Sequence, residues 1–243
     1  HGNELFALAE SKGVALRFEA AVAGGIPVIE AVKTSLAGNH VSSVAGIING
    51  TGNFILTEMA AKGREFSDVL AEAQALGYAE ADPAFDIDGT DAAQKLVLLA
   101  SLAFGARIDA NALFKQGVDS VAPADIEYAR ELGYRIKHLG IAKRENDALQ
   151  LRVHPTLIPE AKAIAQVDGV LNAIMINASG VGELLLVGPG AGSRPTASAV
   201  MADVISVARS IASDEQPSIH SMGVSVTAMS QPAIADINEV TSA

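Results

Sequence analysis

The stretch GYAEADPAFDIDGTDAAQKLVLLASLAFG, residues Gly77–Gly105, decides what fold and what chemistry we expect of this chain. Its first half carries five carboxylates within about a dozen residues, and these are Glu80, Asp82, Asp86, Asp88 and Asp91. Lys95 follows them at the start of the apolar run LVLLASLAF. Acidic side chains this dense before one lysine indicate either a solvated loop or a charged site.

The second half of this stretch predicts a buried helix. Asp88 or Thr90 can cap its first free amides, and Gly89 lets the chain turn into it. The run after Lys95 is apolar on nearly every face, which is typical of a helix packed inside a protein. Asp91 lies four residues before Lys95, so we expect both on one side of the helix. On its own, such a pair is an ordinary helix ion pair and does not identify an enzyme.

The composition limits the class of protein. Of the 243 residues 49% are hydrophobic, enough for a packed core in one large domain or two small ones. The formal net charge of -11 and the aromatic content of 4% argue against nucleic acids and anionic membranes as partners. The chain has no cysteine, which excludes disulfides and fits a cytoplasmic protein. No uninterrupted apolar run approaches about twenty residues, so we expect no membrane span.

The pattern along the chain predicts helices beside antiparallel strand pairs. We expect helices over residues 1–13, 29–36, 54–63, 66–76, 90–104, 123–132, 161–166 and 196–212. We expect strands over residues 14–22, 40–48, 114–121, 135–143, 149–153, 173–178 and 182–187. The order predicts an α+β or α/β fold, with a central mixed sheet covered by helices.

Two further segments join an expected strand to an expected helix through glycines. Asn49, Gly50 and Thr51 precede one helix, whose free amides suit anions or polar ligands. LLLVGPGAGSRPTASAV, residues 184–200, has the order of a phosphate cradle but lacks the third glycine of the dinucleotide fingerprint. The five histidines show no spacing typical of zinc ligands, and no GxSxG motif indicates a serine hydrolase.

Eleven positions in and before the acidic stretch stand at the spacing of the homoserine dehydrogenase signature. They are Ala73, Gly77, Tyr78, Ala79, Asp82, Pro83, Asp86, Ile87, Gly89, Asp91 and Lys95. Gly46–Leu56 is also similar to the GxxNGTxNxIL segment that lies beside the substrate pocket in that family. Agreement at so many positions is more specific than one short motif. Most of residues 1–212 therefore resembles the homoserine dehydrogenases.

The resemblance implies NAD(P)-dependent interconversion of L-homoserine and L-aspartate 4-semialdehyde, on the route to threonine, methionine and isoleucine. Oxidation of an alcohol needs a base for its proton, and the resemblance gives this role to Lys95, with Asp91 orienting it. Glu80 and Asp86 are expected to receive the substrate ammonium group in charge-assisted hydrogen bonds. The other residues expected beside the substrate are Asn49, Gly50 and Thr51.

The resemblance also implies a cofactor, NADP or NAD, and a bound sodium ion. The GPGAG segment would touch a cofactor held mainly elsewhere, through Gly190, Ala191 and Gly192. The sodium ligands carried over by position are Glu19, Val22, Gly24 and Ile26. Oxygen ligands at a glycine-rich bend suit a hard cation. From the sequence alone, Glu19 is equally compatible with the exposed face of an edge strand.

The same resemblance divides the chain into four parts. Residues 1–25 would end a Rossmann-type nucleotide-binding domain, and residues 26–187 would form the substrate-binding, catalytic and dimerisation domain of a homodimer or homotetramer. Residues 188–212 would form the cofactor-contacting loop and a helix that packs back on the nucleotide-binding domain. Residues 213–243 read as a linker or tail. The chain starts at His1 without a Met or a signal peptide, so we expect a piece of a longer protein that is inactive alone.

Two other functions stay open from the residues. Glu80 and Asp86 are compatible with the acid and base of a carboxylate-pair hydrolase, although a carbohydrate site would favour aromatic platforms. The acidic loop is also compatible with the partner surface of a non-catalytic assembly domain.

Overall fold

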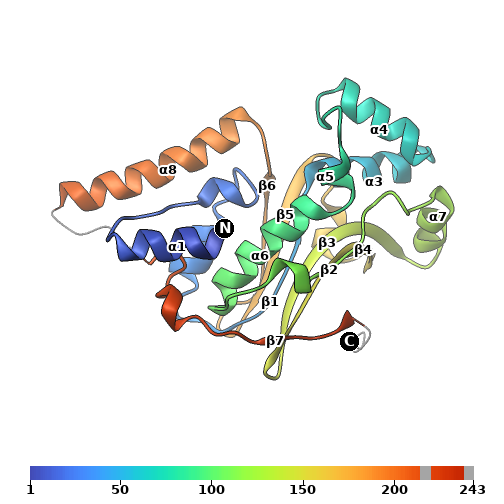
Figure 1. Ribbon diagram of the computed structural model, residues 1–243. Helices are drawn as coiled ribbons and strands as arrows, with labels where there is room; N and C mark the ends of the chain where they lie inside the picture. Colours follow the sequence, from blue (N-terminus) through green and yellow to red (C-terminus); the bar gives the residue numbers. More distant parts are fainter. Residues whose placement is uncertain (214–219, 238–243) are drawn as a thin grey trace.

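The computed structural model describes residues 1–213 and 220–237, and these build one mixed sheet with helices packed on it (Figure 1). In the described residues the strands are β1 (Val41–Ile47), β2 (Phe114–Lys115), β3 (Tyr134–Glu145), β4 (Ala148–Pro159), β5 (Leu171–Ala178), β6 (Gly182–Pro189) and β7 (Ala233–Ile234). Their order is β2-β4-β3-β1-β5-β6, and β7 also pairs with β4. β2 and β7 pair with β4 in parallel, whereas the central pairs are antiparallel. The expected mixed sheet covered by helices is confirmed.

The helices agree with most of the expected ranges. They are α1 (Gly2–Ser11), α2 (Val28–Glu30), α3 (Gly50–Lys62), α4 (Phe66–Ala75), α5 (Ala84–Ile87), α6 (Thr90–Phe104), α7 (Pro123–Glu131) and α8 (Ser193–Ala212). Short helical turns are η1 (Glu19–Ala21), η2 (Ala31–Ser35), η3 (Ala110–Ala112), η4 (Ala163–Gln166) and η5 (Val226–Ala228). α3 and α6 end at Gly63 and Gly105, whose φ angles of 61° and 57° lie in the left-handed region that glycine tolerates. No helix of the described residues is long and apolar enough to cross a membrane.

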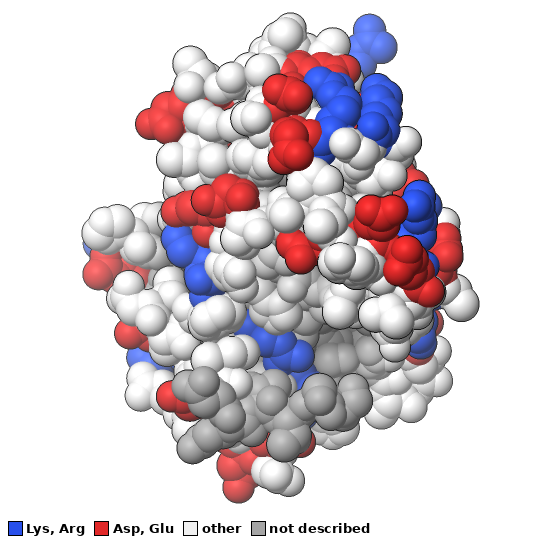
Figure 2. Space-filling model, turned by 90° about the vertical axis from the view of Figure 1, so that its right-hand side faces the viewer, with Lys and Arg blue, Asp and Glu red and all other residues white. Residues whose placement is uncertain are grey.

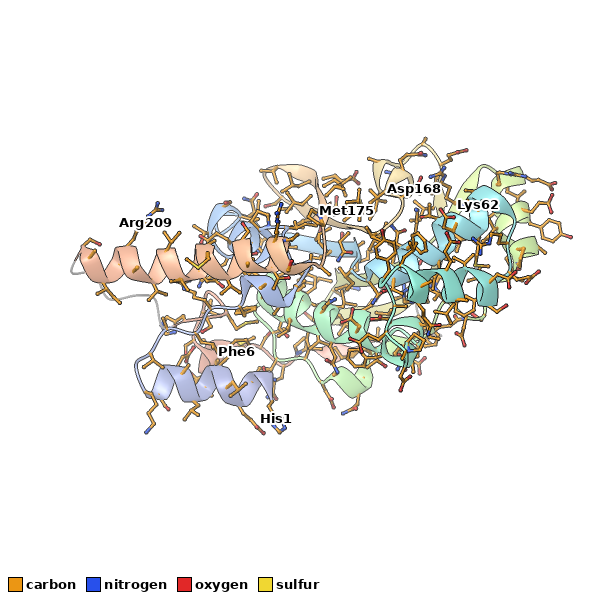
Figure 3. The ribbon with its side chains drawn as sticks, turned by 90° about the horizontal axis from the view of Figure 1, so that it is seen from above. His1, Phe6, Lys62, Asp168, Met175 and Arg209 are labelled. Atoms are coloured by element: carbon orange, nitrogen blue, oxygen red, sulfur yellow. The ribbon has the colours of Figure 1, made fainter. Side chains whose placement is uncertain are left out.

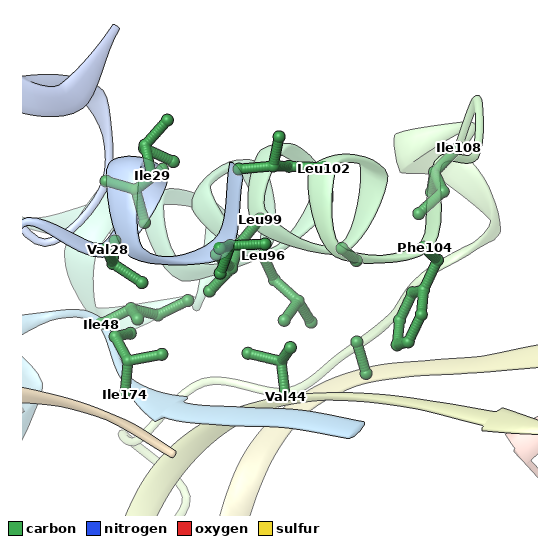
Figure 4. Close-up of a cluster of buried hydrophobic side chains, with 14 of the residues drawn as sticks. Val28, Ile29, Val44, Ile48, Leu96, Leu99, Leu102, Phe104, Ile108 and Ile174 are labelled. Atoms are coloured by element: carbon green, nitrogen blue, oxygen red, sulfur yellow. The ribbon is translucent and has the colours of Figure 1, made fainter. Parts of the chain in front are cut away.

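The main core lies between α6 and one face of the sheet (Figure 4). Leu96 and Leu99 of α6 are each 1% exposed and belong to the same cluster as Val44 of β1 and Ile174 of β5. Neighbouring strand residues point to the other face, where Ile47 belongs to a second, smaller cluster. The packing of α6 therefore fixes its first turns against the end of β1.

Two expected strands differ from the structure. Residues 14–18 form no strand and η1 follows them, because within the described residues no strand pairs with this segment. Its apolar side chains pack instead, with the rings of Phe18 and Phe6 centred 5.2 Å apart. Only the first two residues of the strand expected over 114–121 pair with β4. The Val118 amide donates to the Ile87 carbonyl at 2.9 Å, which turns the chain towards α5.

Residues 220–237 pack on the body of the protein, although the sequence indicated a linker or tail. The Glu10 carboxylate of α1 accepts a hydrogen bond from the Val226 amide at 3.0 Å. Farther along, β7 pairs with β4. The other residues of this C-terminal part, 214–219 and 238–243, lie outside the described residues. The described part of this segment therefore connects α1 to β4 of the sheet.

α8 extends away from the sheet, at the same end of the molecule as α1 (Figures 1 and 3). Of its residues only Ala199 is buried. An apolar stripe on α8 is 43% to 52% exposed and consists of Val200, Met201, Val204 and Ile205. The Asp203 carboxylate accepts the Glu19 amide at 2.9 Å and ties α8 to η1. α8 therefore leaves an apolar surface without a partner in the described residues.

The face of the molecule that carries α7 shows acidic and basic side chains interspersed (Figure 2). The buried Lys137 of β3 anchors α3 to the sheet. Its amine donates to Asn53 Oδ1 at 3.2 Å, to the Val167 carbonyl at 2.7 Å and to Asp168 Oδ1 at 2.8 Å. Asn53, in turn, donates to the carbonyls of Val167 and Leu171 at 3.0 and 3.1 Å. This network fixes the first half of α3 to the loop before β5.

The charges of this network shift each other's protonation. Burial lowers the pKa of the Lys137 amine below its usual value, and Asp168 offsets part of this effect. For Asp168, burial raises the pKa, but the hydrogen bonds and charges of Lys137 and Arg135 outweigh it, so the pKa lies below its usual value. Folding therefore favours the ionised Asp168 carboxylate.

We expect Asp168→Asn to lower the free energy of unfolding at pH 7 by on the order of 1 kcal/mol, a modest value because the Asp168 side chain is 45% exposed. A carboxylate with a lowered pKa stabilises the fold above its unfolded pKa, and this stabilisation is lost as the pH falls through its folded pKa. The difference from the unsubstituted chain should therefore shrink as the pH falls through the acidic range. Urea unfolding at several pH values measures it, with the exposed Asp147→Asn as control. A difference that grows towards acid would contradict this account.

Candidate functional site

Lys95 and Asp91 form an ion pair on the first turns of α6, as their spacing predicts. The Lys95 amine lies 2.7 Å from Asp91 Oδ2, and the two side chains are 23% and 18% exposed. The amine also donates to the Ile48 carbonyl, just after β1, at 3.3 Å. An ammonium group has three hydrogens, so these two acceptors leave one for a further partner.

Asn49 connects this pair to a second carboxylate. Its side-chain nitrogen donates to Asp91 Oδ2 and to Asp86 Oδ1, both at 3.0 Å. Its side-chain oxygen accepts the Gly52 amide at 2.8 Å and so caps α3. One buried amide therefore fixes the N-terminus of α3, the first turn of α6 and α5 relative to one another.

Thr51 and Gly50 complete this junction. The Thr51 hydroxyl donates to the Tyr78 carbonyl at 2.7 Å, and Asp86 Oδ2 lies 3.3 Å from it. A Cβ atom on Gly50 would lie 2.8 Å from the Val170 carbonyl oxygen, so this position has room only for glycine unless the backbone moves. The junction of α3, α5 and α6 thus brings together five residues that the sequence singled out: Lys95, Asp91, Asp86, Asn49 and Thr51.

Two other acids of the decisive stretch lie outside this network. Glu80 is exposed, and its main-chain carbonyl, rather than its carboxylate, accepts a hydrogen bond from Gln74. Asp88 accepts the Thr90 amide at 2.7 Å and the Lys115 amine at 3.0 Å, and it anchors the start of α6. Burial raises the pKa of Asp88, but these bonds outweigh it and lower the pKa overall. The structure therefore assigns Asp88 a structural role.

The charges of the junction suit a cationic ligand. Asp86 and Asp91 carry two negative charges and Lys95 carries one positive charge, which leaves one negative charge uncompensated at this site. Each Asp86 oxygen has one donor nearby and keeps capacity for another. An ammonium group is therefore favoured next to Asp86, whereas a developing oxyanion is favoured next to Lys95.

The GPGAG loop lies against the turn that carries the other predicted ligands. A Cβ atom on Gly24 would overlap the Gly190 carbonyl, and the Gly25 amide donates to the Pro189 carbonyl at 3.0 Å. Gly192 precedes α8 with a φ of 114°. Ala191 and Gly192 are exposed, whereas Gly190 is buried. The residues predicted for the cofactor and for sodium therefore lie side by side, although they are far apart in the sequence.

Glu19 is 5% exposed, which rules out the alternative of an exposed strand face. Its two carboxylate oxygens accept the amides of Ile29 at 2.9 Å and Glu30 at 2.8 Å, and this closes the first turn of α2. Burial raises the pKa of Glu19, and these amides offset only part of the rise. Within the described residues no group of three or more His, Asp or Glu side chains could hold a metal ion. An ion at this turn would take most of its ligands from main-chain oxygens, with Glu19 as the one carboxylate.

Sequence analysis missed Asn172, a residue of β5 beside both glycine-rich segments. It is 1% exposed, and its side-chain oxygen has no hydrogen-bond partner. A Cβ atom on Gly190 would overlap the Asn172 amide. The only signal for it was one amide inside the otherwise apolar segment VLNAIMI, residues 170–176.

Comparisons with known proteins agree with the resemblance. A family model described as Homoserine dehydrogenase matches residues 27–205. The homoserine dehydrogenase of Pseudomonas aeruginosa is 54% identical over 243 residues, which are 100% of this chain and 56% of that protein. The crystal structure of a homoserine dehydrogenase from Thiobacillus denitrificans matches with a TM-score of 0.86 and 55% identity, over 88% of this chain and 49% of that one.

A more distant structure carries a cofactor. It is a hyperthermophilic archaeal homoserine dehydrogenase mutant in complex with NADPH, with a TM-score of 0.73 and 29% identity over 85% of this chain and 60% of that one. The chain spans about half the length of the curated relatives it matches. The family model covers most of the chain, and the site network contains Asp86, Asp91 and Lys95 of the signature positions. The chain therefore belongs to the homoserine dehydrogenase family.

Proposed function

We propose that this chain is the substrate-binding part of an NAD(P)-dependent homoserine dehydrogenase, which interconverts L-homoserine and L-aspartate 4-semialdehyde. The observation that carries the proposal is the Lys95 amine, which Asp91 holds at 2.7 Å in a network that also includes Asp86. This arrangement combines a proton donor, its orienting carboxylate and an acceptor for an ammonium group.

Lys95 is the acid and base of the proposed reaction. When the semialdehyde is reduced, charge develops on its oxygen, and the free hydrogen of the Lys95 ammonium can move to that oxygen. In the reverse direction, the neutral amine takes the proton of the homoserine hydroxyl. Asp91 and the Ile48 carbonyl keep the amine in place during both steps. The nicotinamide supplies or receives the hydride when it is bound.

Asp86 is proposed to receive the substrate ammonium group, and Asn49 and Thr51 hold its carboxylate in position. Binding of the ammonium group by Glu80 stays a prediction, because no hydrogen bond of the described network involves its carboxylate. The hydrolase alternative needs Glu80 and Asp86 as a pair, and the network joins Asp86 to Asp91 instead. The geometry therefore favours the dehydrogenase.

Gly190, Ala191 and Gly192 are proposed to touch the cofactor, and the NADPH bound to the archaeal relative supports this class of cofactor. The unpaired Asn172 oxygen beside Gly190 and the exposed Ala191 and Gly192 suit a loop that contacts a polar ligand. The exposed stripe of α8 and the exposed Leu5 and Leu8 of α1, each 54% exposed, suit packing against the nucleotide-binding domain. Residues 1–25 would end that domain, and residues 26–187 would form the catalytic one.

We expect Lys95→Ala to lower turnover by roughly 10² to 10⁴-fold, the usual contribution of a general acid and base. The melting temperature should stay close to that of the unsubstituted protein, because the pair is partly exposed. NADPH absorbance with aspartate semialdehyde measures turnover, on the chain in its full natural length. The exposed Lys62→Ala is the matched control. Undiminished turnover of Lys95→Ala would refute the assigned role, and unchanged folding with unchanged turnover would favour the assembly-domain alternative.

A sodium ion is proposed beside Glu19, Val22, Gly24 and Ile26, where main-chain oxygens and a carboxylate fit a hard cation. The φ angles of Ala23 and Gly24, 55° and 44°, form a tight turn next to the GPGAG loop. We expect a higher melting temperature in sodium chloride than in choline chloride at equal ionic strength, because an ion that binds the folded state stabilises it. Glu19→Gln should weaken this dependence, whereas the exposed Glu183→Gln should keep it. Equal melting temperatures in both salts would exclude the site.

A homodimer is proposed through the sheet face opposite α6. This face carries the partly buried Ile141, Met175 and Leu185, and the neighbouring Val187 is 48% exposed. We expect a dimeric mass in sedimentation equilibrium. Leu185→Asp should dissociate the dimer, because burying an unpaired carboxylate in the interface costs free energy. Leu132→Asp on the exposed end of α7 is the control. A monomeric mass for the unsubstituted protein would contradict the proposed homodimer.

The proposed reaction belongs to the aspartate route to threonine, methionine and isoleucine. The cytoplasmic location expected from the sequence stays a prediction.

A further inference from the structure

The side-chain amide of Asn172 lies where the two glycine-rich segments of the site meet. Asn172 is the second residue of β5 and pairs with Gly188 of β6. A Cβ atom on Gly190 would overlap its amide, and one on Gly50 would lie 3.6 Å from its oxygen. One side chain therefore lies between the loop proposed for the cofactor and the helix start proposed for the substrate.

The oxygen of this amide is buried without a hydrogen bond. Among the described residues four buried side-chain atoms lack a partner, and they are Arg17 Nε, Glu58 Oε2, Asn172 Oδ1 and Ser221 Oγ. Only the Asn172 oxygen lies next to both glycine-rich segments. A leucine has the same branch at Cγ and no unpaired polar atom, so packing alone does not account for an asparagine here.

We propose that the Asn172 oxygen accepts a hydrogen bond from the carboxamide NH₂ of the bound nicotinamide ring. This inference rests on the proposed function. The seam between the substrate segment and the cofactor loop is where the two reacting carbons must meet. A neutral acceptor suits the neutral carboxamide, whereas an ammonium group is better held by the carboxylates of Asp86 and Asp91. The bond fixes which face of the ring is turned towards the substrate.

The test removes either the acceptor or the donor. Asn172→Leu removes the acceptor and keeps the branch at Cγ, and the 3-acetylpyridine analogue of NADP⁺ replaces the donor NH₂ by a methyl group. Calorimetric titration of the full-length protein gives the dissociation constants of both dinucleotides, and thermal unfolding gives its stability. Asn177→Leu makes the same change on β5 away from the loops, where Asn177 donates to Ser43 at 2.9 Å.

We expect Asn172→Leu to weaken NADP⁺ binding roughly five- to tenfold, the usual effect of one lost hydrogen bond. Binding of the analogue should be the same in both proteins, and the melting temperature should stay close to that of the unsubstituted protein, because the Asn172 oxygen makes no internal hydrogen bond. Asn177→Leu should bind NADP⁺ normally. Should Asn172→Leu not fold, Asn172→Ala removes the same acceptor and has the same expected outcomes.

Three results would overturn the inference. These are unchanged NADP⁺ binding, an equal loss for NADP⁺ and the analogue, or a loss of homoserine affinity alone, which would move Asn172 to the substrate. Failure of the unsubstituted full-length protein to bind NADP⁺ would instead refute the proposed function. The two failures are therefore distinguishable.

Discussion

The burial of α6 against the sheet is the constraint on which the candidate site depends. Leu96 and Leu99 are each 1% exposed, and burying a side chain of this size contributes about 1.5 to 3 kcal/mol. The ion pair of Lys95 and Asp91 is partly exposed and contributes about 1 kcal/mol or less. The core therefore holds the pair in place, and the pair adds little to the stability of the core. Because the fold depends little on the ion pair, the residues at positions 91 and 95 can serve a chemical role without a large loss of stability.

Asn49 explains why the acidic stretch and the NGT segment act as one unit. Its oxygen is used by the cap of α3, so its nitrogen is left to bridge Asp86 and Asp91. Two carboxylates that share one amide donor repel each other unless a cation is close, and Lys95 supplies that cation on one side only. In the described network the Asp86 carboxylate has no cation beside it. The site is therefore polarised, with its cation at α6 and its acidic end at α5.

The sequence predicted what depends on spacing along one element. The Asp91 and Lys95 pair and the helix that carries it follow from a four-residue interval and an apolar run. What depends on neighbours far along the chain was not predictable. The apolar residues 14–18 had the composition of a strand, but the described fold offers them no strand to pair with. Whether Glu19 was buried or exposed stayed open, because the amides that receive it belong to another turn.

The contact of Gly24 with Gly190 links the GPGAG loop to the turn that follows η1. The loop continues directly into α8, and the Asp203 carboxylate of α8 holds η1, which begins the turn that carries Gly24. α8 is therefore connected to both residues of this contact, to Gly190 through the chain and to Gly24 through η1. The Gly190 backbone also touches the Asn172 amide, so α8, the GPGAG loop and β5 are joined by one continuous series of contacts.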